Sequence, residues 1–309
     1  MSSVTPYEYA WDLIRRFDLK SAPVDVEAVA GRLGLTIKYF DNPNTADPDY
    51  HKTLVTACAW IKKDIKTMWV YRDMPVTRQR LSIAHEIMHF LNPYHACISP
   101  FNGNDTTPYF NSKPQERQAY EGALWLLFLC DKFADRIRHE KPSIELINRL
   151  AHEHDVSPEA TAMWYVHANT RPCALVVTEP LKGITREHED VMFSVAESGQ
   201  PMPKEVVLNN GKKLALKPHA LQVRYSVFSK EVAKKPFAKG RGIPLDSPIC
   251  YSYRSGELYR GEISGLELGL GRTTEHYECE SVRFGVPGEY KVMTLAWLDP
   301  SQQDLFDYC

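Results

Sequence analysis

Most of the first 170 residues carry apolar side chains three or four positions apart, a spacing that predicts amphipathic helices. Capping residues mark where several of these helices begin; Thr5-Pro6-Tyr7-Glu8, for example, is a capping box with proline at the first helical position. The predicted helices run from Thr5 to about Phe17, Asp25 to Leu33, Thr77 to Asn92, Pro114 to about Arg138, Ser143 to about His154, and onward from Ser157. The predicted strands, rich in β-branched and aromatic residues, are Leu35–Phe40, Thr56–Ile61 and Lys66–Tyr71. The polar segment Pro93–Pro114 is predicted to be a loop.

After Arg171 the pattern changes to short apolar runs separated by turn residues. A strand is predicted at Cys173–Thr178 and a helix at Arg186–Glu197. Three hairpins are predicted, with turns at Asn210-Gly211, Ser255-Gly256 and Pro287-Gly288. We therefore expect an α+β protein of two domains, 1–170 and 171–309. The first is mainly helical with a small N-terminal sheet, and the second is rich in strands.

Composition narrows the class of protein. The 309 residues are 43% hydrophobic and 25% charged with a net charge of −2, so no overall basic excess points to nucleic acid. The longest apolar stretch, Ala123–Cys130, is too short to span a bilayer. Seven cysteines occur singly without a CxxC pair, as is typical of reduced thiols, and charges interrupt the N-terminus where a signal peptide needs apolar residues. We expect a cytoplasmic protein with no membrane partner.

The segment AHEIMHF at residues 84–90 contains the pattern HExxH. On a helix, His85 and His89 lie four residues apart on one face, so both rings can reach one ion. Glu86 follows His85 directly and lies beside that ion, where it can hold a water molecule as a general base. The pattern thus predicts two zinc ligands and a catalytic carboxylate.

A zinc site that performs catalysis needs a third protein ligand and one open position. Glu116 fits best, because it stands at the start of the next predicted helix, on one face with the small residue Ala119, which lets two helices approach closely. Glu121 and His95 are the alternative ligands.

Four motifs together resemble one known family. RQRLSIAHEIMHF followed by ERQAYEGALWLL resembles the ImmA/IrrE metallopeptidases, and SAPVDVEAVAGRLGLTIKYF and LAHEHDVSPEATAMWY are similar to flanking motifs of that family, over about residues 5 to 170. The resemblance implies a zincin-like metallopeptidase domain that holds Zn²⁺ through His85, His89 and Glu116, with Glu86 as the base. For the second half, its position and strand-rich pattern suggest, by analogy only, the GAF-like sensor domain of IrrE-type members.

Three residues bear on how such a site would work. Tyr120 stands where the family usually has Asn or Asp, a position outside the ligands that is expected to orient a ligating histidine. Met88 replaces a glycine and is expected to narrow the space beside the metal. The thiolate of Cys97, in the predicted loop, could take the open position of the zinc as an inhibitory ligand, and the alternative is an ordinary free cysteine.

The resemblance also implies a substrate. Members of this family cut a partner protein, commonly a helix-turn-helix repressor encoded nearby, and so switch on stress, mobile-element or phage-defence genes. We therefore expect a zinc-dependent endopeptidase whose second domain senses a signal. The alternative is a non-proteolytic regulator that keeps the zinc fold and acts by binding a repressor or nucleic acid.

Charge suggests one candidate signal. Residues 211–260 contain eleven lysines and arginines against three acids, interleaved with aromatic residues. Basic grooves with stacking aromatics hold single-stranded nucleic acid. The residues that would bind single-stranded DNA are Lys230, Lys234, Lys235, Lys239 and Arg241. The alternative is a solvated basic face balanced by the acidic stretch that follows it.

Overall fold

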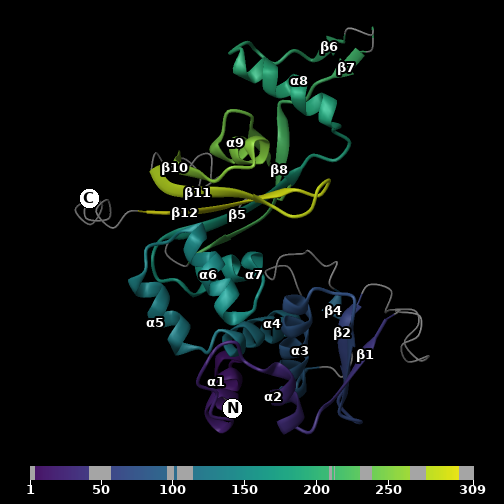
Figure 1. Cartoon of the computed structure of the whole chain (residues 1–309), viewed down its shortest axis with the longest axis vertical. Helices are drawn as coiled ribbons and strands as arrows, with labels where there is room; N and C mark the ends of the chain where they lie inside the picture. Colours follow the sequence, from purple (N-terminus) through teal and green to yellow (C-terminus); the bar gives the residue numbers. More distant parts are fainter. Residues whose placement is uncertain are drawn as a thin grey trace. The chain divides into compact units, whose positions relative to one another are not determined.

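The computed structural model describes residues 4–41, 57–95, 101–102, 114–208, 211, 213–229, 239–264 and 276–298. It combines helices with antiparallel and mixed sheets (Figure 1), so the predicted α+β class is confirmed. The chain divides into two compact units. Unit 1 comprises Met1–His139 and Asn148–Thr161, and unit 2 comprises Glu140–Ile147 and Ala162–Cys309.

The helices of unit 1 begin largely where capping residues predict them. They are α1 (Pro6–Arg16), α2 (Val26–Arg32), α3 (Val76–Leu91), α4 (Pro114–Leu127) and α5 (Asp131–His139), while α6 (Ile144–His154) and α7 (Pro158–Ala168) each contribute to both units. The Thr5 hydroxyl accepts a hydrogen bond from the Glu8 backbone, and the Glu8 carboxylate accepts one from the Thr5 backbone, so the capping box is present. Asp25 caps α2 in the same way through the Ala28 backbone.

A small sheet packs against the helices of unit 1. Its strands are β1 (Thr36–Phe40), β2 (Ala57–Lys62), β3 (Thr67–Tyr71) and β4 (Phe101–Asn102), in the order β1-β3-β2-β4. β1 runs parallel to β3, and β2 is antiparallel to β3 and β4. The helix α3 packs on β2 and β3 on one side and on α4 on the other. The prediction of a loop over Pro93–Pro114 is wrong at Phe101–Asn102, which form β4. Two residues are too few to leave a strand pattern in the sequence.

The long helix predicted from Pro114 to Arg138 is wrong in one respect: it is two helices. α4 ends at Leu127, and Leu129 and Cys130 have left-handed backbone angles (φ 56° and 44°) before α5 begins. Because the run Ala123–Cys130 is apolar throughout, it contains no polar or glycine residue to mark the break. Packing sets the break instead: Phe128 in the bend lies against His154 of α6, with ring centroids 4.9 Å apart and the rings tilted by 52°.

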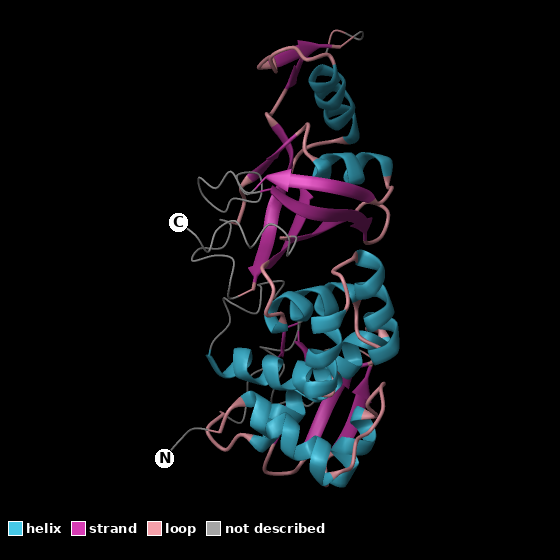
Figure 2. Cartoon of the chain, turned by 90° about the vertical axis from the view of Figure 1, so that its left-hand side faces the viewer, coloured by secondary structure: helices cyan, strands magenta, loops and turns pink. Residues whose placement is uncertain are grey.

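Unit 2 is built on a six-stranded antiparallel sheet in the order β10-β11-β12-β5-β8-β9. Figure 2 draws strands in magenta and helices in cyan. Its strands are β5 (Cys173–Pro180), β8 (His219–Phe228), β9 (Gly242–Pro244), β10 (Tyr259–Ser264), β11 (His276–Phe284) and β12 (Lys291–Trp297). The helices α8 (Arg186–Glu197) and α9 (Pro248–Ser255) supply Met192 and Ile249 to the core formed on this sheet. A separate hairpin joins β6 (Glu205–Val207) to β7 (Lys213–Ala215).

Two predicted hairpins are confirmed and one is wrong. β11 and β12 form a hairpin around Pro287-Gly288, and β6 and β7 form another around Gly211, although Asn210 lies outside the described residues. The residues before Ser255-Gly256, however, form α9. Ser247 caps this helix and Pro248 is its first residue, while Gly256 ends it with a left-handed backbone (φ 77°). These helix signals outweigh the alternation of the sequence YSYRS.

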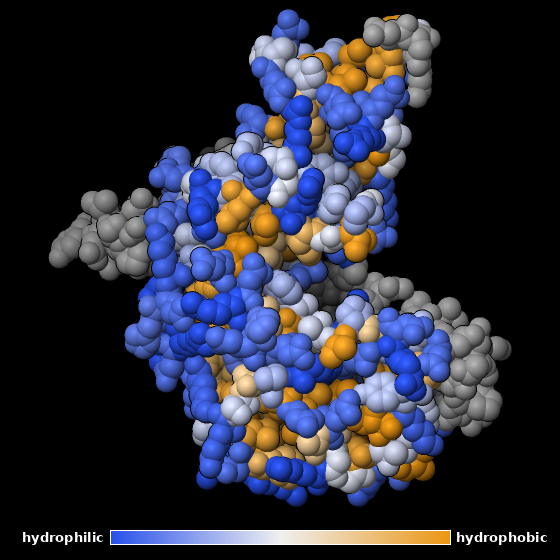
Figure 3. Space-filling model, viewed as in Figure 1, coloured by the Kyte–Doolittle hydropathy of each residue, from blue (hydrophilic) through white to orange (hydrophobic). Residues whose placement is uncertain are grey.

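In the part of the chain that the structure describes, no helix has the length and apolar content needed to cross a bilayer. Figure 3 shows hydrophilic side chains interspersed with apolar patches over the described surface of the face in view.

Candidate metal centre

Three side-chain atoms from two helices meet in unit 1. The Nε2 atoms of His85 and His89 lie 3.0 Å apart, and Glu116 Oε2 lies 3.1 Å from the first and 3.5 Å from the second. A tetrahedral zinc ion bound at about 2.0–2.1 Å holds its ligand atoms about 3.3 Å apart. The triangle therefore already has the size of one face of a zinc tetrahedron. Among the described residues, His85, His89 and Glu116 are the group of side chains whose ligand atoms lie close enough together to hold a metal ion.

The packing of α3 between the sheet and α4 fixes this triangle. His85 and His89 are 0% and 3% exposed, one helical turn apart on the face toward α4. Ala119, fully buried on α4, lets that helix come close enough for Glu116 to reach both rings. The Glu116 side chain keeps 18% of its surface exposed, so the triangle is reached from solvent on its side.

Glu86 lies beside the histidines without a partner for one of its oxygens. It is 1% exposed, and Oε1 has no hydrogen-bond partner among the described residues. Burial raises its pKa well above the usual range, the charge of Glu116 adds to the rise, and Lys63 opposes it. A buried carboxylate oxygen with no partner is a position for a water molecule, which is what a general base next to a metal requires.

The ligand atoms are electrostatically coupled. Burial alone would raise the pKa of Glu116, but hydrogen bonds and charge from His85 and His89 outweigh it and hold the pKa well below its usual range. Burial lowers the pKa of His89, against the effect of its hydrogen bond to Glu116. A neutral imidazole and an ionised carboxylate are the forms that bind zinc, so the donor set fits this metal.

Comparison with known families identifies this part of the chain. A family model described as the IrrE N-terminal-like domain matches residues 30–163. The chain contains an IrrE N-terminal-like domain. The predicted resemblance is thus confirmed for residues 30–163. His85, Glu86, His89 and Glu116 all lie within the matched residues.

A solved structure described as a Mycobacterium tuberculosis transcriptional regulator is also similar. The alignment covers 98% of this chain and 90% of that one, with a TM-score of 0.51 and 12% sequence identity. At this identity the likeness shows the fold alone. Among curated proteins, no match was found.

His95, one of the alternative ligands, has a different place in the IrrE-like domain. It lies outside the triangle, and its Nδ1 is 3.0 Å from Nδ1 of His89, the ring nitrogen that faces away from Glu116. Its own Nε2 lies 3.1 Å from Gln118 Oε1 on α4. Glu121, the other alternative, is also outside the group. Sequence reasoning missed the contact between His95 and Gln118, although both residues lie close in sequence to a predicted ligand.

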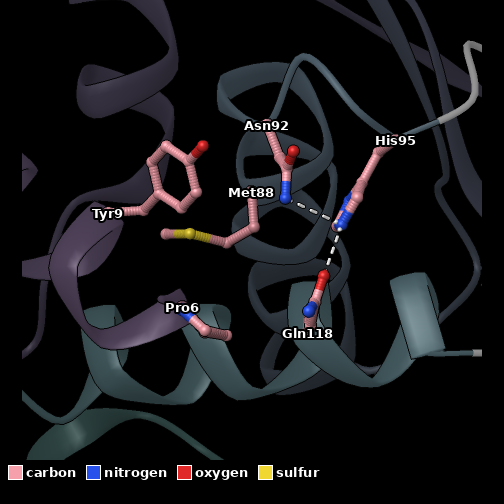
Figure 4. A pocket seen from close by; sticks show the side chains of 6 residues that line it. All are labelled: Pro6, Tyr9, Met88, Asn92, His95 and Gln118. Atoms are coloured by element: carbon pink, nitrogen blue, oxygen red, sulfur yellow. Dashed lines mark hydrogen bonds between the residues drawn. The ribbon is translucent and has the colours of Figure 1, made fainter. Parts of the chain in front are cut away.

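That Met88 narrows the space beside the metal stays a prediction. Its sulfur packs over Gly122 of α4, the helix that also supplies Glu116. Figure 4 shows Met88 beside Pro6 and Tyr9 of α1, and these residues border a cavity of about 10 Å³, the size of one water molecule. The methionine therefore belongs to the contact of α3 with α1 and α4.

Two further predicted site residues stay predictions. Burial raises the pKa of Tyr120, and its charged neighbours are Glu159, which adds to the rise, and Arg78, which opposes it. Cys97 lies outside the described residues.

The basic stretch of unit 2 is largely paired with acids where it is described. Arg224 pairs with Glu179 at 2.6 Å and Arg260 with Glu280 at 3.0 Å. Two more pairs are Lys213–Glu205 and Arg254–Glu197. Lys239 and Arg241 are exposed in the turn before β9, whereas Lys230, Lys234 and Lys235 lie outside the described residues. These ion pairs reduce the positive charge that the stretch offers to a polyanion.

Proposed function

We propose that the IrrE-like domain is a zinc-dependent endopeptidase. The observation that carries the proposal is the triangle of His85 Nε2, His89 Nε2 and Glu116 Oε2 with the unpartnered Oε1 of Glu86 next to it. Three ligands from the protein leave one zinc position open for a substrate or water. The peptidase family of the matched domain supports the same reaction class.

The chemistry divides between the metal and the chain. Zinc held by these three side chains would act as a Lewis acid toward the scissile carbonyl and acidify a water molecule. Glu86 Oε1 accepts the proton of that water and later delivers it to the leaving amine. The burial of Glu86 favours the protonated carboxyl that this transfer creates. Glu116 and the two histidines stay in place, because both helices are packed into the core.

We propose a helix-turn-helix transcriptional repressor encoded nearby as the substrate. Its cleavage would derepress stress, mobile-element or phage-defence genes. The similar solved structure is described as a transcriptional regulator, which supports a role in gene control. Unit 2 would sense the signal that determines when cleavage occurs.

The test is co-expression of the full chain with the small helix-turn-helix protein encoded beside it. Wild type should cut that protein, and Glu86→Gln should leave it intact while retaining wild-type zinc content. Cleavage by Glu86→Gln equal to that of wild type would refute the assignment. If neither chain cuts but both release the repressor from its DNA, the chain is the non-proteolytic regulator.

For unit 2 we propose a sensing role. A pocket of about 550 Å³ lies between α8 and α9, bordered by Phe193, Tyr251 and Arg254. Its volume is in the range of small-molecule sites. A GAF-like fold and single-stranded DNA as the signal remain proposals. For DNA, a labelled oligonucleotide should bind in a salt-dependent manner and lose affinity with Lys239→Glu and Arg241→Glu; no binding at low salt would discard it.

A further inference from the structure

The two ring nitrogens of His89 face different partners. Nε2 points into the ligand triangle, 3.0 Å from His85 Nε2 and 3.5 Å from Glu116 Oε2. Nδ1 lies 3.0 Å from Nδ1 of His95. Both rings are buried, at 3% and 4% exposure, so water does not compete freely for this contact. His89 therefore touches the candidate metal position with one nitrogen and a second imidazole with the other.

We propose that His95 is the positioning residue that holds His89 in its metal-binding tautomer. The inference rests on the proposed zinc site. A histidine that binds metal through Nε2 carries its proton on Nδ1, and the partner of that N–H fixes both the tautomer and the ring orientation. His89 Nδ1–H then donates to the lone pair on His95 Nδ1.

The second ring nitrogen of His95, Nε2, has a hydrogen-bond acceptor in the same tautomer. With Nδ1 as acceptor, His95 carries its proton on Nε2 and donates it to Gln118 Oε1, 3.1 Å away on α4. Figure 4 shows this bond together with the contact to Asn92, whose Nδ2 lies 3.0 Å from the same His95 nitrogen. The amide of Asn92 is a donor and the oxygen of Gln118 is an acceptor. His95 Nε2 accepts from Asn92 when the ring proton is on Nδ1 and donates to Gln118 when the proton is on Nε2. In the second tautomer, which the proposal requires, Gln118 is the partner of Nε2 and the Asn92 amide is not.

The loop that carries His95 is tied to the rest of unit 1. Lys63, in the turn between β2 and β3, donates hydrogen bonds from Nζ to the carbonyl oxygens of Asn92 (2.8 Å) and His95 (3.0 Å). The Tyr94 backbone N–H donates to Asn92 Oδ1 at 3.0 Å, which fixes the amide of Asn92. The sheet therefore holds the His95 backbone while α4 holds its ring.

The arrangement joins α3 and α4 twice. Glu116 connects the helices through the metal position, and two residues later Gln118 connects them through His95 and His89. Ligating histidines usually donate to a carboxylate, a carbonyl or water. Here the acceptor is a neutral imidazole, which orients the ring without adding negative charge to the site.

The test is zinc affinity of the full chain, measured by competition with a chromophoric chelator. His95→Phe keeps a buried ring but removes the acceptor, and it should weaken zinc binding about 10- to 100-fold. His95→Asn offers its amide oxygen near the former Nδ1, and it should stay within a few fold of wild type. Gln115→Ala is the control. Gln115 donates a hydrogen bond to the Tyr94 carbonyl in the same loop, but it does not take part in the hydrogen bonds that join His89, His95 and Gln118.

Nitrogen NMR of the histidine rings gives a readout that is independent of catalysis and of folding losses. In the zinc-loaded chain, His89 should carry its proton on Nδ1 and His95 on Nε2. Equal zinc affinity of wild type and a folded His95→Phe, or a zinc-loaded His95 protonated on Nδ1, would overturn the proposal while leaving the peptidase assignment intact. A wild-type chain that binds no zinc would overturn both.

Discussion

Met88 of α3 and Gly122 of α4 occupy one space between their helices. A Cβ atom on residue 122 would stand 2.7 Å from Met88 Sδ and 2.9 Å from its Cγ. Met88 is 2% exposed, so its side chain fills the volume that the missing Cβ leaves. α3 and α4 supply the candidate metal ligands. They pack together here because the large Met88 side chain on α3 faces a glycine on α4, which has no side chain.

We predict that Gly122→Ala destabilises the protein by about 1–3 kcal/mol, because the added methyl overpacks a buried contact. The same change should cost less in a Met88→Ala background, where the sulfur is gone. Urea unfolding of the four chains of this double-mutant cycle measures the coupling. Gly31→Ala is the control: Gly31 is exposed in α2 with open space around it, so alanine there should stabilise. Equal costs for Gly122→Ala in both backgrounds would show that the two residues do not compete for space.

Glu280 on β11 caps a helix from a distance. Its Oε2 accepts a hydrogen bond of 2.6 Å from the backbone of Ile144, the first residue of α6, and its Oε1 accepts one from Arg260. Because Glu280 is 7% exposed, Glu280→Ala should leave a buried N–H unpaired and cost about 1–3 kcal/mol in thermal or urea unfolding. Glu262→Ala, on the neighbouring strand with a carboxylate that is mostly exposed, is the matched control and should be near neutral. A loss at Glu280 no larger than that at Glu262 would argue against the cap.

His154 should make unit 1 sensitive to acid. Burial lowers its pKa, against the effect of the bond from its ring to the Leu127 carbonyl at 3.0 Å. As the pH falls, His154 is therefore protonated first in the unfolded chain, near pH 6.5. The contribution of the neutral ring to folding stability is present above that pH and is lost as the pH falls toward the pKa of His154 in the folded protein.

We predict that His154→Asn, which can still donate to Leu127, flattens the fall of unfolding free energy between pH 7 and 5. The slope should differ from that of wild type by up to about 1.4 kcal/mol per pH unit. Urea unfolding across this range measures it, with the exposed His152 replaced in the same way as the control. Parallel curves for wild type and His154→Asn would contradict the assignment of the loss to this ring.

Local signals predicted the parts of unit 1 that depend on neighbours in sequence. Thr5 and Asp25 mark helix starts, and the proline after Asn92 marks the end of α3, because each acts within one helical turn. The spacing of His85 and His89 places both rings on one helical face, and their meeting with Glu116 follows from pairing two helices.

Tertiary packing decided what the sequence pattern could not. The bend at Leu129 and Cys130 interrupts an unbroken apolar run, and only contacts with α6 reveal it. The space that Met88 fills lies over Gly122 in another helix. His95 looked like a ligand because its residue type fits one, yet the loop held by Lys63 turns its ring to the back of His89. Each of these outcomes depends on residues far apart in the chain.

Zinc content of the purified full chain tests the central claim most directly. Inductively coupled plasma mass spectrometry after zinc loading and desalting should find one zinc ion per chain for wild type and for Glu86→Gln. His89→Ala and Glu116→Ala should each lose most of it, since two protein ligands hold zinc far more weakly than three. A wild-type chain without zinc, or folded His89→Ala and Glu116→Ala chains that keep a full zinc ion, would contradict the metal centre described by these residues.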